Sequence, residues 1–512
     1  MSPHAPGTVP DDHPRLGPVV VALVVVFVCA FCASVPFLRY RYGAADPAAG
    51  YLPFGPLVLL AIACWVIAPL ARRVLGRSEK FVRAALLFYA VATTLGGFST
   101  SFTVLQIPQV ITSLRYFATP LNGFEAVVFP LIPDTLIITN EVAARGFFEG
   151  ARGGGIPWDM WVGPLVRWGA LALLYLITAW AMLGMFRRRW IRHERLPFPL
   201  AEIPLFVAGH GQFGMTRDPG HTRNKLLGVG MVLVAVVHSI NAVNRYIPSI
   251  PAIPMRFSFT PLFEHPPFDV LRGASWATAW VDIPLIGISY LMPSAMALGV
   301  FGFFLLLLGV MVASRFFGDP TFGPLNFNRW GSQKDHQAGA YVGLLIFVLW
   351  TSRTDLAEMG RGLWRQVSGT SDGDEHPDRW MPVIFALGLL GLCWWCVSAG
   401  VSFPVALAFM LAALALTFGF AMVTAQTGLP ALQTDNLPAQ FLTAFVPAKK
   451  IGLQNLALLG FFNTMFSWYK RHALQPCAMQ GLKIADTERF RDHTFLPAIF
   501  IGGAIVIALN LT

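Results

Sequence analysis

Residues 16–38 read LGPVVVALVVVFVCAFCASVPFL, an apolar run without a single charged side chain. A run of about 20 apolar residues crosses hydrocarbon as an α-helix, because only a helix or a closed barrel satisfies its own backbone there. The run is too long for the apolar part of a secretory signal, and the segment before it carries Asp11 and Asp12 with a single arginine. We therefore predict a first membrane span that stays in the protein.

Similar runs recur along the whole chain. The clearest others are 52–70, 81–105, 161–186, 226–243, 296–314, 341–350, 381–399, 404–423, 453–468 and 496–511. Hydrophobic residues make up 55% of the 512 residues and charged residues only 12%, against roughly 25% in soluble domains. The alternation of a membrane barrel is absent. We predict an all-α polytopic integral membrane protein with roughly ten to fourteen transmembrane helices, some of them broken or re-entrant.

Basic residues set the expected orientation. The net charge is +10, but the 37 Lys and Arg gather in short clusters between apolar runs, which does not fit a nucleic-acid-binding surface. Clusters at 72–83 and 187–195 predict cytoplasmic loops by the positive-inside rule. The N-terminus is then cytoplasmic, and residues 106–159 form an external loop.

The chain divides into an N-terminal transmembrane half, 1–280, and a C-terminal half, 281–512. The last apolar run reaches Thr512 without a polar tail, so we expect the sequence to be cut short. Two C-x-x-C pairs, Cys29 with Cys32 and Cys393 with Cys396, place sulfurs on one helix face. They fit either a redox or soft-metal pair or ordinary small apolar residues of membrane helices.

Two proline-broken strings stand out. Prolines interrupt ERLPFPLAEIP from Glu194, and the piece is too short to cross the membrane and return. It fits a re-entrant segment from the cytoplasmic side or a proline-rich loop on the headgroups. TGLPALQTDNLP from Thr427 lies about 230 residues later and is similarly built. The pair indicates either an inverted repeat with interrupted helices, as in secondary transporters, or a coincidence among 38 prolines.

Polar residues within these apolar surroundings are the candidate substrate- or ion-binding groups. Glu202 is the first, since an intramembrane carboxylate typically relays protons or binds a cation; its alternative is an interfacial ion pair with an arginine, the role we expect for Glu194. The others are Gln426 directly before the second string, Asp435 and Asn436 within it, Asn455 and Asn463 on one later helix, and Arg245. A solvated loop, hydrogen bonds between helices and a snorkelling arginine are their respective alternatives.

No zinc motif, nucleophile elbow or nucleotide-binding loop occurs. We expect no catalytic residue, metal or cofactor.

Several strings carry a resemblance to a known family. They are EVAARGFFEG with IPWDMWVGPL, RRRWIRHERLPFPLAEIPL, AQTGLPALQTDNLP and HALQPCAMQGLKIAD, beginning at residues 141, 156, 187, 425 and 472. The chain resembles a bacterial family of uncharacterised polytopic membrane proteins that is itself similar to the oligopeptide transporters. The resemblance implies a bacterial inner-membrane protein that moves a small peptide or metal chelate, coupled to protons.

We therefore expect a secondary active transporter working by alternating access, with the lipid bilayer and a small solute as partners. The oligomeric state stays open, a homo-oligomer included. The alternatives are a structural or assembly subunit of a membrane complex and a membrane enzyme acting on a lipid-linked substrate. A transporter predicts a closed polar cavity between the two broken strings, and a structural subunit predicts tight packing there.

Overall fold

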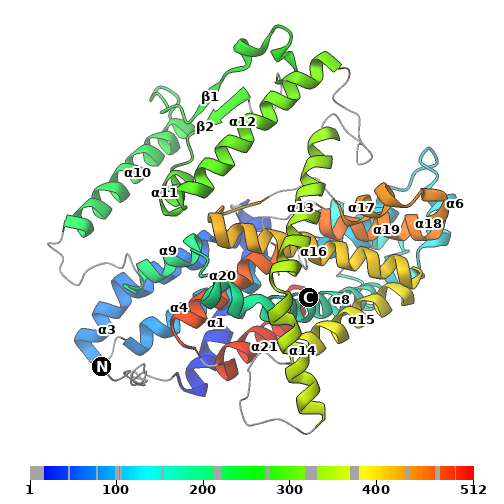
Figure 1. Cartoon of the computed structure of the whole chain (residues 1–512), viewed down its shortest axis with the longest axis horizontal. Coiled ribbons are helices and arrows are strands. Elements are labelled where there is room, and N and C mark those ends of the chain that lie inside the picture. Colours follow the sequence, from blue (N-terminus) through cyan, green and yellow to red (C-terminus); the bar gives the residue numbers. More distant parts are fainter. Residues whose placement is uncertain are drawn as a thin grey trace.

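The computed structural model describes residues 16–43, 46–75, 79–98, 103, 106–150, 155–210, 222–271, 277–317, 331–368, 380–432, 437–467, 473–490 and 492–511. It is helical almost throughout (Figure 1). The α-helices are α1 (Pro18–Tyr42), α2 (Phe54–Ile62), α3 (Ala68–Leu75), α4 (Glu79–Phe98), α5 (Ile107–Tyr116), α6 (Phe124–Val127), α7 (Glu141–Glu149), α8 (Trp158–Arg188), α9 (Pro199–Val207), α10 (Thr222–Tyr246), α11 (Ile283–Leu291), α12 (Ser294–Phe317), α13 (Gly331–Thr351), α14 (Arg353–Val367), α15 (Met381–Ser398), α16 (Phe403–Thr427), α17 (Pro438–Phe445), α18 (Ala448–Ile451), α19 (Leu453–Ser467), α20 (Leu474–Thr487) and α21 (Asp492–Leu511).

Shorter elements join these helices. The π-helical turns η1 (Ala63–Ile67) and η5 (Arg189–His193) continue α2 and α8, and 3-10 turns are η3 (Phe129–Leu131), η4 (Asp134–Leu136), η6 (Thr260–Phe263) and η7 (Phe268–Leu271). Two three-residue strands, β1 (Arg256–Ser258) and β2 (Thr278–Trp280), pair antiparallel with Arg256 opposite Trp280.

Every predicted apolar run contains a helix. Within the described ranges, eight helices are long and apolar enough to cross a membrane, and ten if each of two bent pairs counts as one span. The prediction of an all-α chain with many apolar helices is thereby confirmed, and it fits a multi-pass membrane protein.

The two halves of the sequence form one bundle. Helix α15 packs antiparallel on α8, where Gly388 meets Thr178 and Gly391 meets Leu174. The lack of side chains at these glycines lets the two backbones approach, as is common between membrane helices. Helix α20 likewise runs back along α4, with Gly481 against the Ala90 carbonyl. Contacts between the halves therefore build the core itself.

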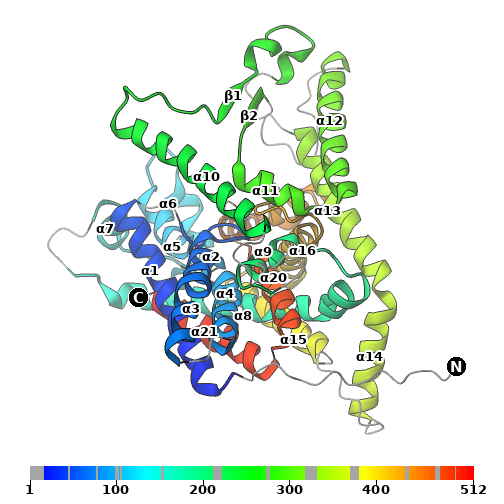
Figure 2. The same ribbon diagram turned by 90° about the vertical axis from the view of Figure 1, so that its left-hand side faces the viewer.

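Helices α10 and α12 form a lobe beside the bundle, joined through α11 and the two strands (Figures 1 and 2). Their apolar windows are 0% and 6% buried. Of α11, only Ile288 is buried. Two apolar helices this exposed are compatible with contact to lipid on most sides.

The segment predicted as an external loop, 106–159, is folded into helices over its described part. Ile107, Val110 and Ile111 line the buried face of α5. The Ile138 amide donates to the Ile111 carbonyl at 2.8 Å, and the Trp168 indole on α8 donates to the Leu136 carbonyl at 3.0 Å. This segment therefore consists of short helices, and it packs onto α8. Residues 151–154 lie outside the described residues.

Candidate functional site

The two proline-broken strings meet inside the bundle. The backbone amide of Phe198 donates to the carbonyl oxygen of Ala425 at 2.9 Å. Gly428 lies directly against the ring of Pro199. We call this contact, with the neighbouring segments 46–52 and 428–432, the junction.

The local backbone explains why the strings can touch. Phe198 has φ 45°, ψ 56°, a left-handed conformation that turns the chain sharply before Pro199 begins α9. Proline suits a first helical position because its missing amide hydrogen would have no partner there. Helix α16 ends at Gly428, which has φ 71°. The Gly428 amide donates to the Thr424 carbonyl at 2.8 Å. A Cβ atom at Gly428 would lie 2.6 Å from Pro199 Cβ, so only glycine permits this approach.

Residues 192–210 make an excursion along α20 and return. Arg192 binds Asp486 at 2.8 Å and His210 binds Glu488 at 2.6 Å, so both ends of the excursion lie at the C-terminal end of α20. Its middle, Leu200, packs instead with Cys477 in the N-terminal part of α20. This is the geometry of a re-entrant segment. Leu200 and Phe198 are at most 1% exposed, so the segment does not lie flat on the protein surface.

A second excursion comes from the opposite end of the bundle. Helix α16 starts beside Asn455, whose side-chain oxygen accepts from the Ser402 amide at 2.9 Å. Ser398, just before it, binds Arg167 in the N-terminal part of α8, whereas Arg192 follows the C-terminal end of α8. From there α16 runs to the junction, and the chain returns through α17 and α18 to α19, which carries Asn455. Two excursions from opposite ends therefore touch at their turns.

Side chains fill the junction on its described side. The Tyr51 amide donates to the Pro430 carbonyl at 2.7 Å, and the Cys477 thiol lies 3.9 Å from the Gly50 carbonyl oxygen. Tyr51, Leu200, Cys477 and Ile288 of α11 form one apolar cluster, each at most 3% exposed. Over the described residues, these side chains occupy the place where the sequence predicts a polar cavity.

Polar groups without partners lie on α20 and α16, two of the helices that border the junction. Gln480 is 2% exposed, and neither its amide nitrogen nor its amide oxygen has a hydrogen-bond partner among the described residues. The same holds for the oxygen of Gln475 and the hydroxyl of Thr424, both fully buried. Each such group costs about 1–3 kcal/mol. Their presence at the centre of the bundle therefore needs a reason other than stability.

The sequence did not single out these two glutamines. Their signal was present, since QPCAMQG places two amides within seven residues of a helix that is otherwise apolar at this point. Every residue from Leu474 to Leu482 is buried, against α4, α8, α9 and α16. Helix α20 is thus the central polar helix of the bundle.

Glu202 and Gln426 lie on the two elements that meet. Glu202 is half-buried one turn into α9, and its amide donates to the Phe198 carbonyl at 3.3 Å. Its carboxylate has no ion pair within the described part of the chain. Gln426 is half-buried next to Ala425, the acceptor of the Phe198 amide. Glu194, in contrast, pairs with Arg189, as predicted.

The other predicted residues are not brought to the junction. Asn455 fastens the start of α16, and the Asn463 oxygen accepts from the Ala439 amide at 3.3 Å near the start of α17. These are hydrogen bonds between helices, the alternative considered for both. Arg245 is exposed on α10, in the outer lobe. Asp435 and Asn436 lie outside the described residues.

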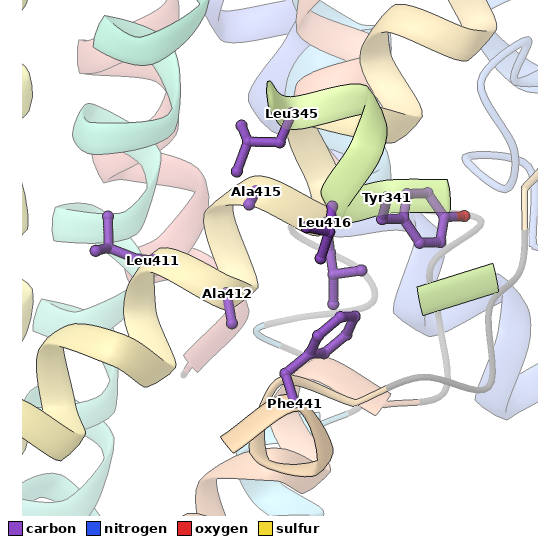
Figure 3. A pocket seen from close by; sticks show the side chains of 8 residues that line it. Tyr341, Leu345, Leu411, Ala412, Ala415, Leu416 and Phe441 are labelled. Atoms are coloured by element: carbon purple, nitrogen blue, oxygen red, sulfur yellow. The ribbon is translucent and has the colours of Figure 1, made fainter. Parts of the chain in front are cut away.

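An apolar cavity of about 190 Å³ lies elsewhere, between α13, α16 and α17. Its lining is Tyr341, Val342, Leu345, Leu411, Ala412, Ala415, Leu416 and Phe441. In Figure 3 the Tyr341 hydroxyl lies on the side away from Leu416. The nearest lining residue on α16, Leu416, lies about three turns before Gly428, so the cavity is separate from the junction. Its surface is almost entirely carbon, and it therefore suits an apolar group better than a polar solute.

Neither C-x-x-C pair forms a disulfide, and all four of these cysteines are buried in α1 and α15. Among the described residues no three His, Cys, Asp or Glu side chains gather to hold a metal ion. These cysteines pack as small apolar residues.

Comparison with known proteins gives one result. The model of a family described as "Family of unknown function (DUF6785)" matches residues 10–512. No curated protein and no solved structure matches.

Proposed function

We propose, for a chain that belongs to the DUF6785 family of unknown function, a secondary active transporter that works by alternating access. The observation that carries the proposal is the junction, where excursions from opposite ends of the bundle touch through Phe198 and Ala425. Interrupted helices that meet midway between two sides are the usual location of solute sites in secondary transporters.

The broken ends supply partial charges at this point. Helix α9 begins at the junction and α16 ends there, so a partly positive and a partly negative helix terminus lie side by side. One backbone hydrogen bond and the Pro199–Gly428 contact hold the two turns together. Tyr51, Leu200 and Cys477 fill the junction in this conformation, in place of the predicted cavity, so the proposal requires the two turns to separate, which would open the junction from one side without breaking either helix.

The unpartnered amides suggest the solute class. Gln475, Gln480 and Thr424 offer neutral donors and acceptors in a buried setting. A short peptide carries matching amide groups, and binding would satisfy the amide atoms that lack partners in the closed state. We infer that the solute is a small peptide, one of the two solute classes, with metal chelates, that the resemblance to oligopeptide transporters implies.

The proposed location is a bacterial inner membrane with a cytoplasmic N-terminus. The Trp65 indole of η1 donates to the Val207 carbonyl at 3.0 Å, so the chain leading to Arg72 and Arg73 runs beside the end of α9. Arg192 lies at the same end, on Asp486. Both basic clusters therefore share one end of the bundle, which supports a common cytoplasmic side.

Cys477 tests whether the junction opens. In a chain whose other five cysteines are replaced by alanine, we expect a membrane-impermeant thiosulfonate to modify Cys477 slowly but measurably. The expected rate is about 0.1–10% of the rate in the denatured chain, the usual population of a minor conformation. Intact-protein mass spectrometry against time gives this rate.

The matched control is a chain that keeps only Cys396, which is equally buried but lies on α15 away from the junction. It should react at least about tenfold more slowly, since only rarer unfolding of the bundle exposes it. Equal protection of both cysteines would argue for a rigid structural subunit, the alternative that the filled junction and the exposed α10 and α12 favour.

Gln480→Leu separates a solute-binding role from a structural one. We expect unchanged or increased stability, by up to about 1 kcal/mol, because the change removes two unpartnered buried polar atoms. Uptake of labelled trialanine into proteoliposomes under an inward proton gradient should fall at least severalfold. Stability is measured by denaturation in mixed micelles.

Gln440→Leu is the control for this change. The Gln440 side chain accepts from the Leu437 amide at 3.0 Å, so its loss should lower the free energy of unfolding by about 1 kcal/mol. If Gln480→Leu behaves like this control and uptake persists, Gln480 is a structural residue. Uptake by the unmodified protein no greater than by empty liposomes would exclude trialanine-like peptides.

A further inference from the structure

A three-residue charged cluster joins helices α4 and α20 to the end of α9. The His210 Nδ1 atom lies 2.6 Å from Glu488 Oε1, and Arg83 Nε lies 3.6 Å from Glu488 Oε2. Arg83 also donates to the Glu488 backbone carbonyl at 2.6 Å. The cluster lies at the opposite end of α9 from the junction and contributes no side chain to it.

Only one member of this cluster reaches solvent. The side chains of Arg83 and Glu488 are each 4% exposed, and that of His210 is 33% exposed. Arg83 is fixed from two sides, because it also lies over the ring of Phe490, 5.3 Å from its centre. Histidine is the side chain that changes charge near neutral pH, so protonation of the cluster from solvent acts at His210.

We propose that His210 and Glu488 form a pH-dependent latch that holds the end of α9 against α20 and α4. The protonated imidazole and the carboxylate make a charge-assisted hydrogen bond, which is about twice as strong as a neutral one. When His210 loses its proton, the ion pair is lost, and the Trp65–Val207 hydrogen bond and the buried side chains of Leu205 and Val207 remain to hold the end of α9.

The charges around His210 fix the direction of the pH dependence. The hydrogen bond to Glu488 raises the pKa of His210, and the charge of Glu79 on α4 adds to this. Burial and the positive charge of Arg83 act against it without cancelling it. Because the pKa is raised in the folded state, the latch is fully formed below the ordinary histidine pKa of about 6.5 and is lost as pH rises through the raised value.

The latch matters for the junction because α9 is short. It has nine residues, with Phe198 at one end and His210 three residues past the other. A helix of this length moves as one body, so loosening at His210 lets the Phe198–Ala425 contact separate. This last consequence rests on the proposed function; the latch itself does not.

Hydrogen exchange of the full chain in detergent tests the latch. We expect amides in residues 200–209, corrected for intrinsic exchange, to exchange about tenfold faster at pH 9 than at pH 6, as for loss of one charge-assisted hydrogen bond. His210→Gln should exchange fast at both pH values. His210→Arg, which stays charged, should exchange slowly at both.

His193→Gln is the control, since His193 is exposed on η5 at the start of the same excursion, and it should follow the unmodified protein. The latch is refuted if exchange in the unmodified protein does not change with pH, or if His210→Gln keeps the unmodified profile. Failure here leaves Cys477 modification untouched, so the latch and the transporter proposal fail separately.

Discussion

Gly428→Ala should destabilise the protein by about 2–5 kcal/mol. A left-handed backbone costs a non-glycine residue about 1–2 kcal/mol, and Gly428 has φ 71°. The new Cβ would also lie 2.6 Å from Pro199 Cβ, and such overpacking typically costs a further 1–3 kcal/mol. Pro199 cannot rotate away, because its ring is closed on the backbone. Denaturation in mixed micelles measures the change.

Gly43→Ala isolates the contribution of the junction. Gly43 also ends a 25-residue helix, with φ 61° and ψ 22°, nearly the values at Gly428, but a Cβ there meets nothing within 4 Å. It should therefore cost only the backbone part, about 1–2 kcal/mol. Equal losses in the two variants would mean that the turns of α9 and α16 are not pressed together. A larger loss at Gly428 with faster Cys477 modification would show that the contact keeps the junction closed.

The meeting of the two strings was foreseeable from their residues. Pro199 begins α9 and Gly428 ends α16, and helices interrupted within a membrane are tolerated only where they are buried in protein or line a wet cavity. The sequence could not show which atoms touch, because that depends on the left-handed turn at Phe198. Bulky side chains rarely take that conformation, so no local preference predicts it.

The central role of α20 was harder to foresee. The chain from His472 to Asp486 is too short and too polar for a membrane span, so its hydropathy does not indicate a helix in the core. Its surroundings make it the core, since α4, α8, α9 and α16 all pack on it. Such burial is a property of four distant segments together, and a single stretch of sequence cannot reveal it.

The roles of the remaining polar residues also depend on segments that are distant in the sequence. Asn455 and Asn463 share a helix, and their spacing allowed a binding site while slightly favouring hydrogen bonds between helices. Their hydrogen-bond partners in the structure show the second role, since the two side chains accept from the backbone amides of Ser402 and Ala439 at the starts of α16 and α17. Asn455 and Asn463 cap neighbouring helices and so have hydrogen-bond partners, whereas both amide atoms of Gln480 lack one among the described residues. Unmet hydrogen bonds, more than polarity, therefore mark candidate binding residues in this bundle.

Arg83→Met should cost about 3–5 kcal/mol, the second of the largest effects. The change leaves the Glu488 carboxylate buried at 4% exposure without its guanidinium partner, and an uncompensated buried charge carries a penalty of this size. It also removes the donor to the Glu488 carbonyl, at the point where α4 meets the end of α20. The free energy of unfolding, from denaturation in mixed micelles, measures the loss.

Arg145→Met is the matched control, because its partner Glu141 lies one helical turn away and both side chains are at least half exposed. An exposed pair contributes about 0–1 kcal/mol, so this variant should remain close to the unmodified protein. Adding Glu488→Met to Arg83→Met should restore much of the stability, since it removes the stranded charge. If the double variant is as unstable as the sum of the single changes, packing of Arg83 against Phe490, and not charge pairing, holds α4 to α20.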